Sequence, residues 1–107
     1  MKILIVEPGK DPRPDEINRS LEAMQKVVGG YIQAVYPFDD YVALICNEEG
    51  KINGLPFNRW LVDDDTGIAY DYIAGTFFLC AALPDAEHFS DLSPEQFERF
   101  VEYYRRR

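Results

Sequence analysis

Two short apolar runs place the strongest limit on what this chain can fold into. Tyr41–Asn47 (YVALICN) and Gly75–Ala82 (GTFFLCAA) are each almost continuously hydrophobic. Continuous apolar runs are typical of strands buried on both faces of a sheet. We therefore predict a β-sheet that contains both runs, with Tyr41–Asn47 at its centre.

The chain is long enough for one hydrophobic core and too short for two. With 107 residues, it should expose about 6,000 Å² when folded, against about 18,000 Å² when extended. Hydrophobic residues make up 47% and aromatic residues 14% of the sequence, which excludes a disordered or low-complexity protein. No internal repeat or linker is visible, and we predict a single domain over residues 1–107.

Turn signals divide the rest of the first seventy residues. Lys2–Glu7 ends at Pro8 and Gly9 and is predicted to be a strand, as are Tyr31–Tyr36 and Ile68–Tyr72. The Asn47–Gly50 segment is typical of a hairpin turn, with Lys51 and Ile52 returning along the sheet. Two further segments are less regular. We expect a loop at Asp11–Asp15 and a short helix at Leu55–Leu61, with Pro56 in its first turn.

Capping signals mark two helices. In Ser20–Val28, apolar residues recur three and four positions apart, Ser20 is a suitable N-cap and Gly29 a suitable C-terminal exit. At the C-terminus, Ser93 and Gln96 match a capping box, and Leu92 and Phe97 match a hydrophobic staple. Together these elements predict an α+β fold, a mostly antiparallel sheet of four to five strands with the two main helices packed on one face.

The charge of the chain is strongly negative. Lys and Arg number 11 and Asp and Glu number 19, which gives a formal net charge of -8. A chain of this sign is poorly suited to bind nucleic acid directly. The N-terminal apolar run ends at Glu7 and is too short for a signal peptide or a membrane span, so we expect no membrane association.

The two cysteines have no second cysteine at metal-ligand spacing. Cys46 and Cys80 each lie within an apolar run. We interpret them as buried free thiols of a cytoplasmic protein, with a Cys46–Cys80 disulfide as the alternative.

No catalytic or metal-binding pattern is recognisable. His88 is the only histidine, has no nucleophile nearby in the sequence, and is interpreted as a solvated loop residue. The Asp63–Asp65 run lacks the alternating oxygen ligands of a calcium loop and is interpreted as a polar turn. We therefore expect no metal, no cofactor and no enzymatic activity.

Acidic residues are unbalanced over one long stretch. Between Trp60 and Glu98 the sequence contains nine acidic residues and no lysine or arginine. Such a stretch keeps a protein soluble and can steer a basic partner toward it. We predict an acidic interaction surface made of Asp63, Asp64, Asp65, Asp85, Glu87 and Asp91.

A second set of polar residues lies at the ends of the apolar segments. If the Leu55–Leu61 turn packs beside the hairpin, Arg59 and two asparagine amides would converge on a small polar ligand. The same residues would serve equally well as caps of turns. The candidate ligand-binding residues are Asn47, Glu48, Lys51, Asn58 and Arg59.

Three ordered motifs carry a resemblance to a known family. They are VGGYI at Val28–Ile32, NEEGK at Asn47–Lys51 and GLPFNR at Gly54–Arg59. The chain resembles a widespread bacterial family of small domains of unknown function, frequent in phages and conjugative elements. The resemblance extends over roughly residues 1–80 and leaves out the C-terminal helix. It implies a compact accessory protein of a mobile element, with the five candidate ligand-binding residues as its motif positions.

Two hypotheses for function follow. The first is a non-enzymatic interaction module that presents its acidic surface to a basic protein partner. The alternative is a domain that binds a nucleotide or a carboxylate metabolite through Asn47, Asn58 and Arg59, because arginine can hold such a group with two parallel hydrogen bonds. Because fifteen aromatic residues are many for so small a core, we expect either a monomer or a homodimer.

Overall fold

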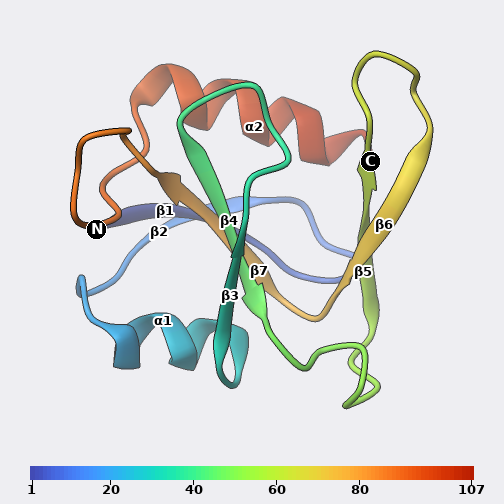
Figure 1. Ribbon diagram of the computed structural model, residues 1–107, viewed down its shortest axis with the longest axis horizontal. Coiled ribbons are helices and arrows are strands. Elements are labelled where there is room, and N and C mark those ends of the chain that lie inside the picture. The colour runs from blue at the N-terminus through green and yellow to red at the C-terminus, as the bar shows by residue number, and fades with distance from the viewer.

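The structure, a computed structural model, describes all 107 residues and contains seven strands and two helices (Figure 1). Five strands form one antiparallel sheet in the order β2-β1-β7-β4-β3, and two form a separate antiparallel hairpin, β5-β6. The α+β fold class and the antiparallel sheet of five strands agree with the prediction. In chain order the elements are β1 (Lys2–Val6), β2 (Arg13–Glu16), α1 (Leu21–Val28), β3 (Ile32–Val35), β4 (Val42–Asn47), β5 (Phe57–Val62), β6 (Ala69–Ala74), β7 (Phe77–Ala81) and α2 (Pro94–Arg105).

The two apolar runs form adjacent strands inside the sheet, and every residue of β4 and β7 is buried. The middle strand is β7 rather than β4, because β7 pairs with β1 on one side and β4 on the other. Leu79 of β7 lies opposite Leu4 of β1 and Leu44 of β4. The prediction that Tyr41–Asn47 forms the central strand is therefore wrong by one position in the sheet.

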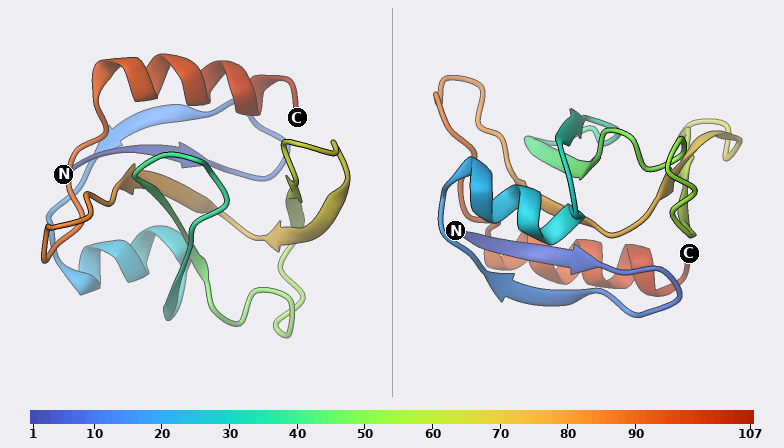
Figure 2. Two further views of the ribbon diagram at one scale, coloured as in Figure 1. Left: turned by 45° about the horizontal axis from the view of Figure 1, so that its top comes forward. Right: turned by 90° about the horizontal axis from the view of Figure 1, so that it is seen from below.

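The helices cover opposite faces of the sheet, which corrects the prediction that both pack on one face. Alternation along β1 directs Leu4 toward one core cluster and Ile3 toward the other. Helix α2 contributes Phe100 to the first cluster, and α1 contributes Val28 to the second. Figure 2 shows the helices on either side of the strands. Strands that are apolar on both faces require cover on both sides, and one helix layer could supply only one.

Both helix boundaries follow their capping signals. Ser20 accepts a hydrogen bond from Ala23 N, and α1 ends at Gly29, whose φ of 79° is left-handed. Ser93 and Gln96 form the predicted capping box at the start of α2. The local sequence is therefore sufficient to fix where these helices begin.

Three local predictions are wrong. The segment expected to be a short helix forms β5, and Asp11–Asp15 contributes to edge strand β2 instead of forming only a loop. After β4 the chain does not return along the sheet. Hydrogen bonds from Asn53 N to Glu49 O and from Gly54 N to Lys51 O fold this segment into successive turns that lead to the β5-β6 hairpin.

Cys46 and Cys80 are buried free thiols, as predicted. They belong to the core clusters on opposite faces of the sheet, which rules out the disulfide alternative in this fold. No helix of the structure has the length and hydrophobicity needed to cross a bilayer.

Candidate functional site

A β-bulge brings the side chains of Asn58 and Arg59 into the interior together. The register of β5 against β6 shifts between Phe57 and Arg59, so two consecutive residues face inward where a regular strand would alternate. The Asn58 amide donates to Val6 O at 2.9 Å and to Gly75 O at 2.8 Å. Asn58 therefore joins β5 to the ends of β1 and β6.

Arg59 is buried, and its terminal nitrogens donate only to amide oxygens. Nη1 donates to Asn58 Oδ1 at 2.9 Å, and Nη2 donates to Lys10 O at 2.7 Å and to Tyr104 O at 3.3 Å. Its Nε has no hydrogen-bond partner. A guanidinium can serve several acceptors at once because its donors form a planar fork. The side chain thus binds the protein's own backbone.

Asn47 also connects two elements of the fold through hydrogen bonds. Its amide nitrogen donates to Val28 O at 3.2 Å, and its Oδ1 accepts a hydrogen bond from Glu49 N at 2.8 Å. A Cβ atom at Gly30 would lie 2.9 Å from the same amide nitrogen. The VGGYI and NEEGK motifs therefore meet here, where the end of α1 contacts the end of β4.

Lys51 and Glu48 line a pocket of about 290 Å³ between β4 and β6, together with Asn47. Lys51 forms an ion pair with Asp71, and its Nζ lies 4.5 Å from the centre of the Tyr72 ring. Cys46 also lines this pocket. Burial raises the pKa of the Cys46 thiol to about 11, so the thiol is protonated near neutral pH.

The structure separates the five candidate ligand-binding residues into two groups. Asn47, Glu48 and Lys51 line the same pocket. Asn58 and Arg59 lie elsewhere, against the ends of β1 and α2. The convergence of Arg59 with two asparagine amides does not occur, because only Asn58 contacts it.

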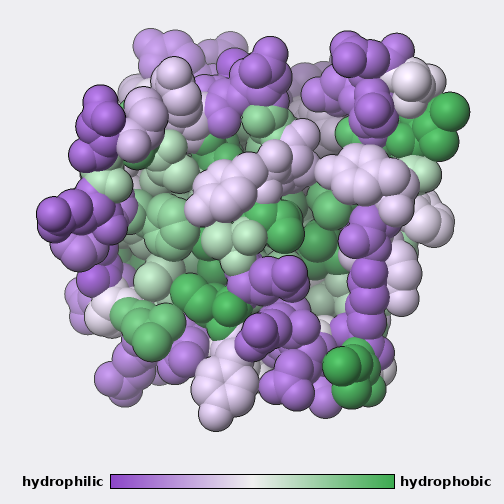
Figure 3. All heavy atoms as spheres, viewed as in Figure 1, coloured by the Kyte–Doolittle hydropathy of each residue, from purple (hydrophilic) through white to green (hydrophobic).

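The candidate acidic residues also fall into two groups. Asp63–Asp65 lie at the tip of the β5-β6 hairpin, and Asp85, Glu87 and Asp91 lie in the connection from β7 to α2, at the other end of the view (Figure 1). The space-filling view likewise shows hydrophilic residues at both ends, with more apolar surface between them (Figure 3). Asp91 has a local role, since Lys2 N donates to its Oδ1 at 2.8 Å.

The sequence interpretation missed an aromatic cluster on the β5-β6 hairpin, in which Phe57 and Trp60 are exposed and Tyr72 is half-buried. Trp60 lies opposite Tyr72 in the hairpin register, and their ring centroids are 6.0 Å apart. Phe57 lies 5.0 Å from Trp60 and 5.8 Å from Tyr72. We call Phe57, Trp60 and Tyr72 the hairpin aromatic face. An interpretation of Leu55–Leu61 as a regular strand would not have revealed it, because Phe57 and Trp60 would then face opposite sides, and only the bulge brings them to the same side.

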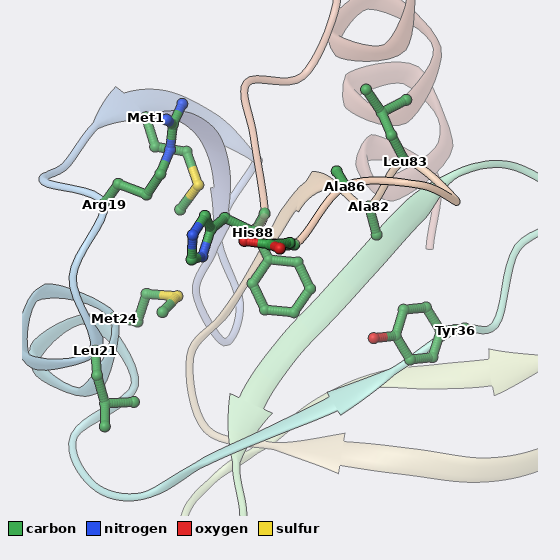
Figure 4. Close-up of a pocket in the computed structure, with 11 residues that line it drawn as sticks. Met1, Arg19, Leu21, Met24, Tyr36, Ala82, Leu83, Ala86 and His88 are labelled. Atoms are coloured by element: carbon green, nitrogen blue, oxygen red, sulfur yellow. The ribbon is translucent and has the colours of Figure 1, made fainter.

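The second missed feature is a pocket of about 560 Å³ beside α1. Its wall is mostly apolar, and its polar side chains are Arg19, Glu87 and His88. Figure 4 shows Arg19, Met1 and His88 on one side, with the Arg19 guanidinium beside Met1, and Tyr36 on the other side. His88 is exposed at the rim, in agreement with its interpretation as a loop residue.

No group of three or more His, Cys, Asp or Glu side chains is arranged to hold a metal ion. No curated protein matches the chain, and no solved structure matches it. A family model matches residues 1–105, so the family includes α2, which the resemblance based on sequence motifs left out. The chain therefore belongs to the family described as a domain of unknown function (DUF3846).

Proposed function

We propose that this protein is a non-enzymatic interaction module that binds a basic protein through the hairpin aromatic face and the acidic hairpin tip. The observation that supports the proposal is the exposure of large aromatic side chains at one place. Trp60 is 54% exposed and Phe57 48% exposed, although both are large and hydrophobic. Clustered exposed aromatic residues are typical of protein interfaces, where tryptophan and tyrosine supply much of the binding energy.

The surroundings of this face favour a cationic partner. Lys51 already shows how a cation binds beside it, because its ammonium group lies over the Tyr72 ring and pairs with Asp71. Lysine or arginine side chains of a partner would find the same combination at Trp60 and at the tip carboxylates. Asp63, Asp64 and Asp65 form no ion pair within the protein.

A second copy of the chain is a less suitable partner. Each chain carries a formal net charge of -8, so two copies repel each other at long range. A basic protein has the opposite charge and would be steered toward the tip. Nucleic-acid-binding enzymes have such basic surfaces, and an accessory protein of a mobile element that covered one would compete with its nucleic acid.

The geometry gives less support to the alternative of a ligand site at Asn47, Asn58 and Arg59. All three side chains are buried, and each donates to oxygen atoms within the protein. A ligand could reach Arg59 only by displacing hydrogen bonds that join β5 to α2. The motif positions thus support the fold, and the interaction surface lies on the outside of the hairpin.

The test compares the partners captured by the wild type, by two hairpin variants and by one control variant. We would immobilise the wild type, Trp60→Ala and Asp64→Asn/Asp65→Asn, and identify the proteins captured from an extract of the source organism. Asp85→Asn/Glu87→Gln is the matched control, because it removes the same number of charges from the other acidic segment. We expect the control to retain a basic partner that both hairpin variants lose, and salt to release it from the wild type.

A direct titration with the purified partner completes the test. Trp60 is the only tryptophan, so fluorescence of the wild type reports directly on this face. We expect the emission to shift on binding, and the shift to disappear at high salt. Equal capture by Asp64→Asn/Asp65→Asn and the wild type, or a partner whose binding leaves Trp60 emission unchanged, would contradict the proposal.

A further inference from the structure

The pocket beside α1 exists because this helix is too short to cover its face of the sheet. With eight residues, α1 is about 12 Å long. The remaining part of the face is bordered by the connection from β7 to α2, and a hollow of about 560 Å³ stays open between the two. Eight of its eleven lining residues are hydrophobic, among them Leu21, Met24, Leu83 and Phe89.

Two polar side chains of this pocket form no hydrogen bond with the rest of the protein, although the charge of Arg19 helps to lower the pKa of Asp91. Arg19 takes part in none of the ion pairs or side-chain hydrogen bonds of the structure, and neither does His88. Both lie on the same side of the pocket, where the Arg19 guanidinium is beside Met1 and the His88 imidazole lies further along (Figure 4). A guanidinium and an imidazole next to an apolar wall are groups that can hold a carboxylate whose organic body is apolar.

We propose that this pocket binds a small organic monoanion, a carboxylate attached to an apolar ring system. The carboxylate would lie at Arg19 and His88, and the ring would contact Met24 and Phe89. The volume is within the usual range for small-ligand sites, about 300 to 1,000 Å³. This site is separate from the hairpin aromatic face, and the inference does not depend on the proposed function.

The negative charge of Glu87 limits which anions this pocket can bind. Its carboxylate also lines the pocket and would repel an anion. A single negative charge that is held by Arg19 tolerates this neighbour better than the double charge of a phosphate monoester does. Arg19 should therefore raise the affinity for a monoanion and Glu87 should lower it. In a purely apolar pocket neither residue would change the affinity.

The first experiment uses four probes that share one ring system. They are 2-naphthoate, 2-naphthyl phosphate, 2-naphthalenemethanol and 2-naphthylmethylammonium, each titrated into the full isotope-labelled chain and followed by NMR. We expect saturable shifts at Met24, Ala82 and Phe89. We expect 2-naphthoate to bind about three- to tenfold more tightly than the alcohol, as for one partly exposed ion pair. The phosphate should bind more weakly than 2-naphthoate, and the ammonium compound more weakly than the alcohol.

The second experiment changes the rim, and its variants alter exposed side chains. Arg19→Gln should lower the affinity for 2-naphthoate about three- to tenfold and leave the affinity for the alcohol unchanged. Glu87→Gln should raise the affinity for 2-naphthoate about two- to fivefold. Lys26→Gln removes one positive charge outside the pocket, as Arg19→Gln does inside it, and as the control for Arg19→Gln it should have no effect. Leu83→Ser should lower the affinity for all four probes.

Three results would overturn the inference. One is equal affinity for 2-naphthoate and the alcohol in the wild type. Another is weaker binding of 2-naphthoate to Glu87→Gln, which would indicate a cationic or zwitterionic ligand. The third is shifts that occur outside the pocket, at the hairpin aromatic face for example.

Discussion

Arg59 of β5 donates a hydrogen bond to the backbone oxygen of Tyr104, 45 residues further along the chain, in the last turn of α2. The positive charge of Arg59 therefore lies where the carbonyl groups at the end of a helix need donors. The same nitrogen donates to Lys10 O. One side chain thus joins the hairpin, the β1-β2 connection and α2.

This arrangement predicts that Arg59 stabilises the fold because its planar guanidinium group can donate to several oxygen atoms at once. Arg59→Lys keeps the charge but cannot reach all of the acceptors, so the free energy of unfolding should fall by about 1 to 3 kcal/mol. Urea denaturation measures this change. Arg99→Lys, at the exposed ion pair with Asp40, is the control and should change stability by less than about 1 kcal/mol. Equal stability of Arg59→Lys and the wild type would show that the contacts of Arg59 are not needed.

The glycines of the motifs predict a graded response to alanine. A Cβ at Gly50 would lie 2.6 Å from the backbone oxygen of Ala74, whereas one at Gly30 would meet the Asn47 side chain at 2.9 Å. The strand backbone must move to admit Gly50→Ala, and the cost should be about 1 to 3 kcal/mol. A side-chain amide adjusts more easily, so Gly30→Ala should cost less. Denaturation of both variants compares them, and the reverse order would contradict the explanation.

The strongest local signals in the sequence were sufficient for much of the fold. Ser20, Gly29 and the Ser93–Gln96 box act within one turn of their own positions, and the helices begin where these residues predict. The apolar runs at β4 and β7 likewise specify buried strands. These signals depend on neighbouring residues and on local hydrophobicity, and both can be recognised in a short stretch of sequence.

The failures involve contacts between distant residues. Pro56 and the apolar residues after it suggested a helix, but the bulge that buries Asn58 and Arg59 depends on acceptors from Val6, Lys10 and Tyr104. The placement of α1 and α2 on opposite faces likewise depends on how β1 and β7 pair. The candidate ligand-binding residues were selected for their polarity. Polarity alone does not distinguish a side chain that hydrogen-bonds two elements of the fold together from one that binds a ligand.

The two thiols should react slowly in the folded protein. Burial raises the pKa of Cys46 to about 11 and that of Cys80 to about 12. At about pH 8 the thiolate fraction is then at least about 100-fold lower than for an unperturbed thiol, and thiolate is the reactive form. Labelling with a disulfide reagent should be slow for the native chain and rapid for both cysteines in strong denaturant. Native labelling at the rate of a free thiol would show that either side chain is accessible.

Asp91 predicts a dependence of stability on pH. The hydrogen bond from Lys2 N lowers the pKa of Asp91 from its ordinary value. A carboxyl group whose pKa is lower in the folded chain stabilises the fold above its unfolded pKa, and the contribution is lost as the pH falls through the folded pKa. The wild type should therefore lose part of its stability below about pH 4. Asp91→Asn keeps an oxygen acceptor but cannot titrate.

The measurement is the thermal midpoint of both chains across the acid range. Asp91→Asn should be less stable than the wild type near neutral pH, and the difference should shrink as the pH falls, because the protonated wild-type carboxyl then resembles the amide. Asp85→Asn is the control, since the Asp85 side chain forms no ion pair in the structure. A constant difference between Asp91→Asn and the wild type at every pH would mean that the charge of Asp91 does not hold the start of β1.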